Sequence, residues 1–323
     1  MKILYFTDPH IRASSPGSRL DDFPETIMKK IEWVGSYAKD NDIEIIIVGG
    51  DWLDRPDVPY SILSNLATML LNWRRNGITV YTVLGNHDLY GYNPKTFSRT
   101  GLSVLCVYDS LKRLSEVPII IGNISLTGVD AHYSLDKDGD VSHYVNVDGD
   151  SDYLKIHVVH GFLDKEKWDQ VPSTAIKDIL HTGADIVLTG HEHKGYGVIK
   201  KGGKLFCNPG ALARVTAGLG DINQEVSVAV IDSDLREIEL AKLPIDIAKP
   251  ASEVLDREKL LKEKDHTAKM MAFSNTISEF QTGESLNLYA LLDNIAKEEK
   301  ASMKAVDISR TKLQEAEEEI AQT

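Results

Sequence analysis

Short apolar runs rich in valine and isoleucine recur through the first two thirds of the chain, and turn-forming or histidine residues follow them. Continuous runs of this kind are typical of strands that are buried on both faces of a sheet. The pattern therefore predicts strands at residues 2–7, 44–48, 80–84, 119–121, 125–129, 155–159, 185–189 and 204–207.

Two amphipathic patterns lie between the early runs, with apolar residues spaced by three or four positions. This spacing places the apolar side chains on one face of a helix that packs on a sheet. A third helix is expected at residues 172–180. Because helices and strands alternate early and strands follow one another more closely later, we predict an α/β sandwich with a mixed sheet. The two stripes are Ile27, Ile31, Val34 and Ala38, and then Leu63, Leu66, Leu70 and Trp73.

The composition shifts after Pro250, beyond which there is no further proline and only one glycine. Charged residues and helix formers dominate there, so we expect a domain at 1–249 and a helical C-terminal region at 250–323. An apolar stripe amid charge suits docking on a partner, and a helical cap packed on the chain itself is the alternative. The stripe consists of Leu286, Tyr289, Leu292 and Ile295.

One internal segment also departs from the strand and helix patterns. Residues 133–153 are acidic and rich in glycine. Such a composition favours turns over packed elements. We therefore expect an exposed loop or hairpin there.

The chain is acidic, with a net charge of −13 from 49 acidic and 36 basic residues. This balance argues against a protein that binds DNA through bulk charge alone. Bound divalent cations would invert the local field, so a DNA enzyme is not excluded. A basic cluster accompanies the last motif described below and is either a nucleic-acid contact or a solvated edge. The cluster comprises Lys194, Lys200, Lys201, Lys204 and Arg214.

Cysteine content and hydropathy indicate the compartment. The two cysteines, Cys106 and Cys207, lie far apart, so neither a disulfide framework nor a cysteine metal cluster is expected. The first residues lack the features of a signal peptide. No stretch approaches the ~18 apolar residues of a membrane span. We expect a cytoplasmic protein without a membrane partner, in the host cytoplasm if it is phage-encoded.

Metal-capable side chains follow five of the predicted strands, and the carboxyl ends of strands are where α/β sheets form ligand sites. Each block alone is compatible with turn or capping chemistry. Independent turns have no reason to collect carboxylate, imidazole and amide donors at successive strand ends, so the blocks together predict a metal site. They are Asp8 and His10 in DPH, Asp51 and Asp54 in GGDWLD, Asn86, His87 and Asp88 in GNHD, His160 in HG, and His191 and His193 in GHEH.

These blocks resemble the signature blocks of the calcineurin-like metallophosphoesterases, and the resemblance spans residues 1 to 215. It implies a four-layer αββα sandwich, in which helices flank two mixed sheets and a dinuclear metal site lies along one edge. One metal would bind Asp8, His10, Asp51 and His193, and the other would bind Asp51, Asn86, His160 and His191.

The identities of the donors indicate the metal and the chemistry. Imidazole, carboxylate and amide ligands suit manganese, iron or zinc better than magnesium, and we expect two Mn²⁺ ions. Two such ions clamp the attacking and leaving oxygens of an in-line displacement and lower the pKa of water. His87 would bind no metal and would donate a proton toward the leaving oxygen, with Asp88 orienting it. Asp54 would brace the site. The candidates for phosphate contact are Arg12, Arg19 and Arg55.

Three features favour a nuclease within this superfamily. The third block reads GNHD where phosphoprotein phosphatases typically read GNHE, Pro56 follows Arg55 where those enzymes have glycine, and a charged helical region follows the catalytic domain. With the segment CNPGALARVTAG at 207–218, this layout resembles the SbcD-type nucleases. That resemblance implies a dimeric DNA exonuclease or endonuclease of repair and recombination, docked on an SbcC-like coiled-coil ATPase.

Two other functions stay open. A small-molecule or cyclic-nucleotide phosphodiesterase would turn over nucleotides but not polymeric DNA, with the C-terminal region as a lid or oligomerisation element. A non-catalytic scaffold is the other alternative. The presence of every expected ligand, together with His87, argues against the scaffold.

Overall fold

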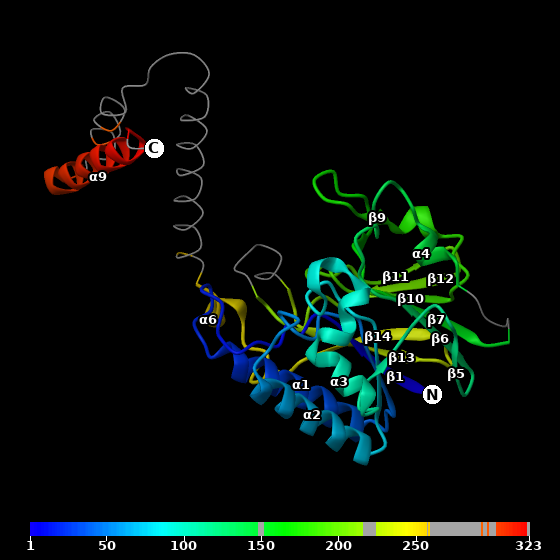
Figure 1. Cartoon of the computed structure of the whole chain (residues 1–323). Coiled ribbons are helices and arrows are strands. Elements are labelled where there is room, and N and C mark those ends of the chain that lie inside the picture. The colour runs from blue at the N-terminus through cyan, green and yellow to red at the C-terminus, as the bar shows by residue number, and fades with distance from the viewer. Residues whose placement is uncertain are drawn as a thin grey trace. The chain divides into compact units, whose positions relative to one another are not determined.

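The computed structural model describes residues 1–147, 152–215, 224–256 and 302–321, together with positions 258, 292 and 296. Contacts divide the chain into two compact units, Met1–Leu260 and Leu261–Thr323 (Figure 1). The first unit holds both large sheets and runs past the domain boundary expected at 249/250.

The first sheet has six strands in the order β14-β13-β1-β2-β3-β4. Strands β1 to β4 are parallel, and β13 and β14 extend the sheet in antiparallel fashion. The carboxyl ends of β1, β2 and β3 therefore lie at one edge. The bounds are β1 Lys2–Phe6, β2 Ile45–Val48, β3 Thr79–Thr82, β4 Lys112–Arg113, β13 Ser227–Asp232 and β14 Glu237–Lys242.

The second sheet also has six strands, in the order β11-β12-β10-β7-β6-β5. Its four central strands are parallel, and the outer strands β11 and β5 are antiparallel to their neighbours. A small parallel pair, β8 (Leu163–Asp164) and β9 (Thr174–Ala175), lies apart from it. The other bounds are β5 Ile119–Ile121, β6 Ile124–Val129, β7 Leu154–Val159, β10 Ile186–Thr189, β11 Gly197–Lys201 and β12 Lys204–Asn208.

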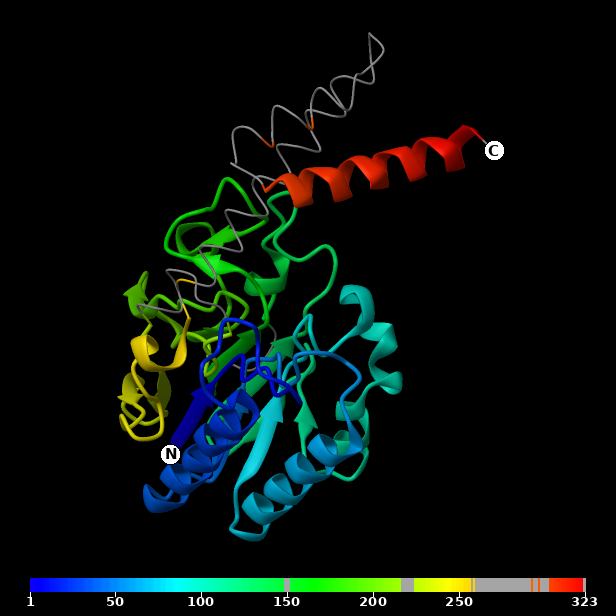
Figure 2. The ribbon, with the colours of Figure 1, turned by 90° about the vertical axis from the view of Figure 1, so that its left-hand side faces the viewer.

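Three helices cover the outer face of the first sheet: α1 (Phe23–Asp40), α2 (Tyr60–Arg75) and α3 (Gly101–Val107). Figure 2 shows α1 and α2 side by side along this face. The predicted stripe of α1, from Ile27 to Ala38, is fully buried. Asp22 caps α1 by accepting a hydrogen bond from the backbone N–H of Glu25 at 3.1 Å.

The apolar core has one layer between the sheets and one on each outer face. Ile47 of β2 and Val158 of β7 are fully buried in the inter-sheet core. Phe206 of β12 is fully buried in a third cluster, on the far face of the second sheet, together with Tyr144 and Ile176. The four-layer α/β sandwich with mixed sheets is therefore confirmed. The short helices are α4 Ser142–Val145, α6 Ala251–Val254, η1 Tyr90–Tyr92, η2 Pro94–Arg99 and η3 Ile176–Ile179.

Two local expectations were wrong. The helix expected at 172–180 is instead strand β9 followed by the 3₁₀ turn η3. Thr174 is held as a strand because its N–H donates to Phe162 O at 2.9 Å and its hydroxyl to Asp136 at 2.7 Å. The loop expected at 133–153 is exposed only in part, since Asp136 is 7% exposed and Tyr144 is fully buried. Its residues 148–151 lie outside the described part.

The described part of the second unit is chiefly the helix α9 (Met303–Ala321). Position 292 of the predicted apolar stripe is helical, and its other three members lie outside the described residues. Helix α9 lies within the C-terminal region that was expected to be helical, residues 250–323. Docking of that region on a partner stays a prediction.

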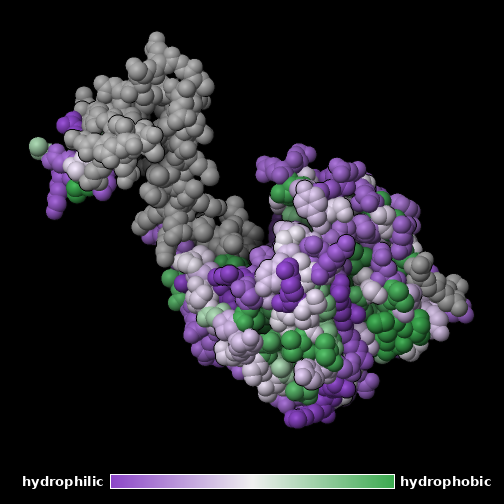
Figure 3. All heavy atoms as spheres, viewed as in Figure 1, coloured by the Kyte–Doolittle hydropathy of each residue, from purple (hydrophilic) through white to green (hydrophobic). Residues whose placement is uncertain are grey.

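Exposed apolar side chains gather in two places on the face drawn in Figure 3, over α3 and around β5. Val107 at the end of α3 is 80% exposed and Val117 before β5 is 72% exposed.

Candidate metal centre

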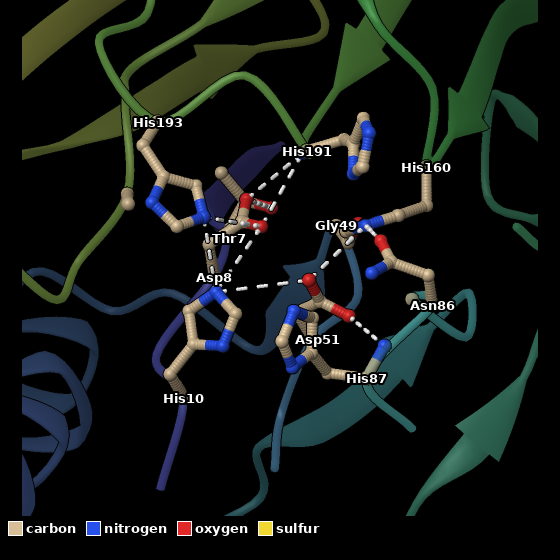
Figure 4. A network of polar contacts seen from close by, with 12 residues as sticks. Thr7, Asp8, His10, Gly49, Asp51, Asn86, His87, His160, His191 and His193 are labelled. Atoms are coloured by element: carbon tan, nitrogen blue, oxygen red, sulfur yellow. Dashed lines mark hydrogen bonds and ion pairs between the residues drawn. The ribbon is translucent and has the colours of Figure 1, made fainter. Parts of the chain in front are cut away.

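The predicted ligands follow the carboxyl ends of β1, β2, β3, β7 and β10, drawn from both sheets (Figure 4). Because the parallel strands of a sheet point the same way, their carboxyl ends share one edge. Main-chain hydrogen bonds connect the loops, with Asp8 N donating to Gly50 O at 3.2 Å and His10 N to Asp51 O at 3.0 Å. The five blocks are thus brought to a common place.

Tight loops hold these residues in an unusual backbone conformation. The φ angle is +53° at Asp8, +45° at His10, +50° at Asp51 and +72° at His191. Residues with a side chain rarely adopt positive φ, at a cost of roughly 1–3 kcal/mol each, and such strain gathers at functional sites. The strain therefore marks the same residues that the sequence motifs single out.

The first donor group consists of Asp8, His10 and His193, whose ligand atoms all lie within 4.8 Å of one another. The Nε2 atoms of His10 and His193 are 3.0 Å apart, and the Asp8 carboxylate lies 3.8 and 3.7 Å from them. The hydroxyl of Thr7 donates to Asp8 at 2.5 Å, and the N–H of His191 donates to it at 3.1 Å. These contacts fix the direction of the carboxylate.

The second donor group consists of Asp51, His160 and His191, again within 4.8 Å. His160 Nε2 lies 3.4 Å from Asp51 Oδ2 and 3.2 Å from the amide oxygen of Asn86. The other ring nitrogen of His160 contacts Gly49 O at 2.6 Å, which orients the imidazole. The structure thus brings Asn86 to this group, as the sequence predicts.

Asp51 stands between the two groups. Its Oδ2 lies 3.4 Å from His160 Nε2 on one side and 3.6 Å from His10 Nε2 on the other. Its Oδ1 accepts a hydrogen bond from the N–H of His87 at 2.8 Å. This is the position that a carboxylate shared by two metals needs.

His87 is exposed beside the donor atoms, and its ring packs edge-on against His10 with centroids 4.8 Å apart. Its Nδ1 donates to the backbone oxygen of Asp54 at 2.8 Å, which leaves Nε2 without this partner. One of its ring nitrogens also lies within 4.8 Å of ligand atoms of His10 and Asp51, so His87 adjoins both donor groups. The orienting partner expected was Asp88, so the contact with Asp54 is a correction. Asp54 also pairs with Arg12 at 3.2 Å and thereby braces the loop.

Asp88 has a different task from the one expected. It is fully buried, and its carboxylate accepts hydrogen bonds from the N–H groups of Trp52 at 3.3 Å, Leu53 at 3.0 Å and Gly85 at 2.9 Å. The residue therefore ties the third block to the second. It acts on the site by positioning the loops that carry Asp51 and Asn86.

Replacing Asp88 by alanine should destabilise the metal-free protein by about 3 kcal/mol or more, because each buried donor left unpaired costs about 1–3 kcal/mol. The N–H groups of Trp52, Leu53 and Gly85 would lose their acceptor. Urea unfolding followed by circular dichroism measures the change. The control is Asp57→Ala, since the Asp57 side chain is 62% exposed. A loss for Asp88→Ala no larger than that of the control would contradict this account.

Burial governs the charge state of the cluster. It raises the pKa of Asp8 and lowers the pKa of His10 well below its usual range. Burial also lowers the pKa of His191 to about 3. At Asp51, burial raises the pKa, but the adjacent His160 outweighs burial and lowers the pKa overall. Burial therefore keeps His10 and His191 neutral, which is the form of an imidazole that binds a divalent metal. At His160, burial lowers the pKa, but the adjacent Asp51 outweighs burial and raises the pKa to about 10, so a metal bound there would displace a proton.

The donor set fits two divalent cations. Imidazole and carboxylate donors whose ligand atoms gather within 4.8 Å of one another are the groups that divalent transition metals bind. His10 Nδ1 is moreover buried without a hydrogen-bond partner among the described residues, so only its Nε2 is engaged. Metal binding by the clustered aspartates and histidines follows from this geometry.

The remaining predicted residues divide into structural and exposed groups. Arg19 is 8% exposed and donates to Asp21 and to Arg214 O, so it is not a phosphate contact. Arg214 is itself buried and donates to Lys249 O at 2.6 Å, which removes it from the basic cluster. Arg55 has a side chain that is 72% exposed and lines a cavity with His87, so it stays a candidate.

Sequence reasoning missed several supports of the site. Glu192, between the two histidines of the last block, accepts hydrogen bonds from Lys194 N at 3.1 Å and Gly195 N at 2.7 Å. Asp136 accepts three hydrogen bonds near His160, as described below. The position of Glu192 inside GHEH was a usable signal. Asp136 gave none, because its partners are distant in sequence.

The sequence profile of the Metallophos family, described as calcineurin-like phosphoesterase, matches residues 1–195. No protein with a curated description matches the chain. Among the described helices, none combines the length and the apolar character needed to span a bilayer.

Solved structures are similar to the chain at low sequence identity. A protein of Thermus thermophilus has 14% identity and a TM-score of 0.44, covering 75% of this chain and 98% of its own. A dimetal phosphatase from Danio rerio has 10% identity and a TM-score of 0.46, covering 71% of this chain and 91% of its own. Likenesses at this level carry no argument about activity.

The match to the family model covers the residues that form the site. It extends over more than half of the 323 residues and includes all five blocks, from Asp8 to His193. Those blocks supply the two donor groups, and the fold is the one that the family resemblance implies. The chain therefore belongs to the calcineurin-like phosphoesterases and is a metal-dependent phosphoesterase.

Proposed function

We propose that this chain is a metal-dependent DNA nuclease that hydrolyses phosphodiester bonds, acting as the exonuclease subunit of an SbcCD-like complex of DNA repair and recombination. The observation that carries the proposal is the exposed His87 beside the two donor groups, with one cavity lined by His87 and a second lined by His160 and His191. A phosphodiester has a substituent on each side of its phosphorus, so a site of this shape suits a diester.

The two cavities share a border. One is lined by Asn86, Tyr92, His160 and His191, and the other by Asp54, Arg55, His87 and Tyr92. Their volumes are ≈ 390 and ≈ 430 Å³. A polymer that crosses the donor groups can continue into either. A phosphomonoester would need only one of them.

The residues have distinct tasks in this proposal. Asp8, His10 and His193 would hold one cation, Asn86, His160 and His191 the other, and Asp51 both. When bound, two divalent cations, which we propose to be Mn²⁺, polarise the phosphoryl group and supply hydroxide near neutral pH. His87 would donate a proton from Nε2 to the leaving oxygen, while its Nδ1–H stays on the Asp54 carbonyl at 2.8 Å.

Replacing His87 by alanine should lower DNA hydrolysis by about 10²–10⁴-fold, the usual contribution of general acid catalysis, while two metals still bind. We would incubate end-labelled linear DNA with Mn²⁺ and the purified protein, with EDTA and His87→Ala in parallel. Exposed His181 supplies the matched control His181→Ala, which should cut like the wild type. Full activity of His87→Ala with both metals bound would remove the acid assignment.

A generic diester, bis-(p-nitrophenyl) phosphate, separates the activity from its substrate. Cleavage of DNA that disappears with EDTA and in His87→Ala supports the nuclease, and the product ladder distinguishes exonuclease from endonuclease. Hydrolysis of the generic diester with intact DNA favours a small-molecule or cyclic-nucleotide phosphodiesterase. The net charge of −13 favours this alternative, because a negative net charge weakens non-specific electrostatic binding to DNA.

We also propose that the C-terminal region docks on an SbcC-like coiled-coil ATPase, which would present DNA ends to an acidic dimeric enzyme. Helix α6 belongs to the first unit, in which Leu20 N donates to Val254 O at 3.0 Å. A truncation should therefore follow Leu260, where the first unit ends. We expect it to keep diester hydrolysis and to lose co-purification of the ATPase, and retained co-purification would count against docking. Free Cys106 and Cys207 fit a cytoplasmic setting.

A further inference from the structure

A cavity of ≈ 390 Å³ adjoins the second donor group, whose members Asn86, His160 and His191 form part of its wall. This volume lies within the roughly 300–1,000 Å³ of small-molecule sites. Aromatic rings form much of the remaining wall, notably Tyr92 and Tyr133. The phosphate-handling atoms and an aromatic cavity are therefore neighbours.

Its two tyrosines are unusually exposed for such large side chains, Tyr133 at 74% and Tyr92 at 47%. The ammonium of Lys137 lies 3.2 Å from the centre of the Tyr133 ring, so positive charge is present at the same wall. Phe162 completes it, with its ring 5.8 Å from that of His191 and 5.4 Å from that of Trp168. Exposed aromatic faces beside a cation suit a flat ring that carries a phosphate.

The wall is held in place by one buried carboxylate. Asp136 is 7% exposed and accepts hydrogen bonds at 2.7 Å from Tyr144 Oη, Phe162 N and Thr174 Oγ1. These bonds tie the segment of Tyr133 to the loop after β7 and to β9. Ligand sites of high affinity are largely formed before binding, because ordering the wall afterwards costs free energy.

We propose that this cavity binds the nucleobase of the nucleotide whose phosphate lies at the donor groups. The inference rests on the proposed nuclease function and adds a subsite to it. A nucleobase offers two apolar π-faces for Tyr92 and Tyr133, whereas the aliphatic side chain of a phosphoserine offers none. Stacking of this kind tolerates every base, which agrees with an enzyme that degrades DNA of any sequence.

Binding to the Mn²⁺-loaded protein tests the cavity directly. Calorimetry compares deoxyadenosine 5′-monophosphate with 2-deoxyribose 5-phosphate, which carries a hydroxyl group in place of the base. The nucleotide should bind about 5- to 150-fold more tightly, the equivalent of ~1–3 kcal/mol for one stacked base. Tyr133→Ala and Tyr92→Ala should each shrink that ratio, and Tyr133→Phe should retain it. The control is Tyr60→Ala, a tyrosine 89% exposed on α2.

Equal affinities of the wild type for the two ligands would overturn the proposal, as would a ratio that neither alanine variant changes. A second arm uses end-labelled oligonucleotides with a normal or an abasic terminal nucleotide. The wild type should cut the normal end faster, and Tyr133→Ala should cut both ends alike. Base-dependent binding without DNA cleavage would support the cavity as a site for free nucleotides and would contradict the proposed nuclease function. Cleavage at the same rate with and without the terminal base would support the nuclease function and would contradict the proposal that the cavity binds the nucleobase.

Discussion

Replacing Asp51 by alanine is expected to abolish phosphodiester hydrolysis and to prevent the binding of both metals. The carboxylate lies 3.6 Å from His10 Nε2 and 3.4 Å from His160 Nε2, so it serves both donor groups. Loss of an outer partner of a metal ligand costs about 10–100-fold in affinity or activity, and loss of a shared ligand should cost more. The two readouts are metal content after dialysis and turnover of bis-(p-nitrophenyl) phosphate.

Two further variants sharpen this experiment. Asp51→Asn keeps the shape and removes the charge, and we expect it to fail as well, because the carboxylate charge is what balances two cations. Asp246→Ala changes an exposed carboxylate far along the chain and should behave as the wild type. If Asp51→Ala retained two equivalents of Mn²⁺ and normal turnover, the shared-ligand assignment would be untenable.

Replacing Gly85 by alanine should have the next largest effect, although this residue carries no ligand atom. A Cβ at Gly85 would stand 2.0 Å from Asp51 Oδ1 and 2.3 Å from Asp51 N. Neither atom can yield without moving the shared ligand, so we expect Mn²⁺ affinity and turnover to fall at least about 10–100-fold. Overpacking should also destabilise the fold by about 1–3 kcal/mol.

Gly17 provides the matched control for that substitution. A Cβ there meets no atom within 4 Å, and its φ lies outside the positive range. Gly17→Ala should therefore keep metal binding, turnover and the urea midpoint. A Gly85→Ala protein that binds two equivalents of Mn²⁺ with the affinity of the Gly17 variant would show that the site tolerates a shift of Asp51.

The sequence predicted those parts of the fold whose signals are local. The apolar run at 45–48 and the stripe from Ile27 to Ala38 are β2 and α1 because both bury every member of their pattern. Strand β14 was not predicted, since its alternating sequence Glu237–Lys242 lies at a sheet edge with little burial. The helix expected at 172–180 was wrong for a different reason. The strand conformation of Thr174 is imposed by its hydrogen bond to Asp136, a residue distant in sequence.

Some features of the site could also be predicted from the sequence, and others could not. Ligand identities were readable because each lies directly after a strand, and the strand fixes its place at the sheet edge. The role of Asp88 was not readable, since its three N–H donors come from two different loops. Likewise, only the folded chain shows that the partner of His87 is the backbone oxygen of Asp54.

The spread of the donors along the chain has a consequence for how activity arises during synthesis. The N–H of His191 donates to the carboxylate of Asp8, 183 residues earlier, and closing so long a loop is slow and entropically costly. A nascent chain that stops before β10 holds no more than part of either donor group. The hydrolytic centre therefore comes into being only after both sheets have been made and stacked, so an unfinished chain lacks a complete set of ligands for either metal.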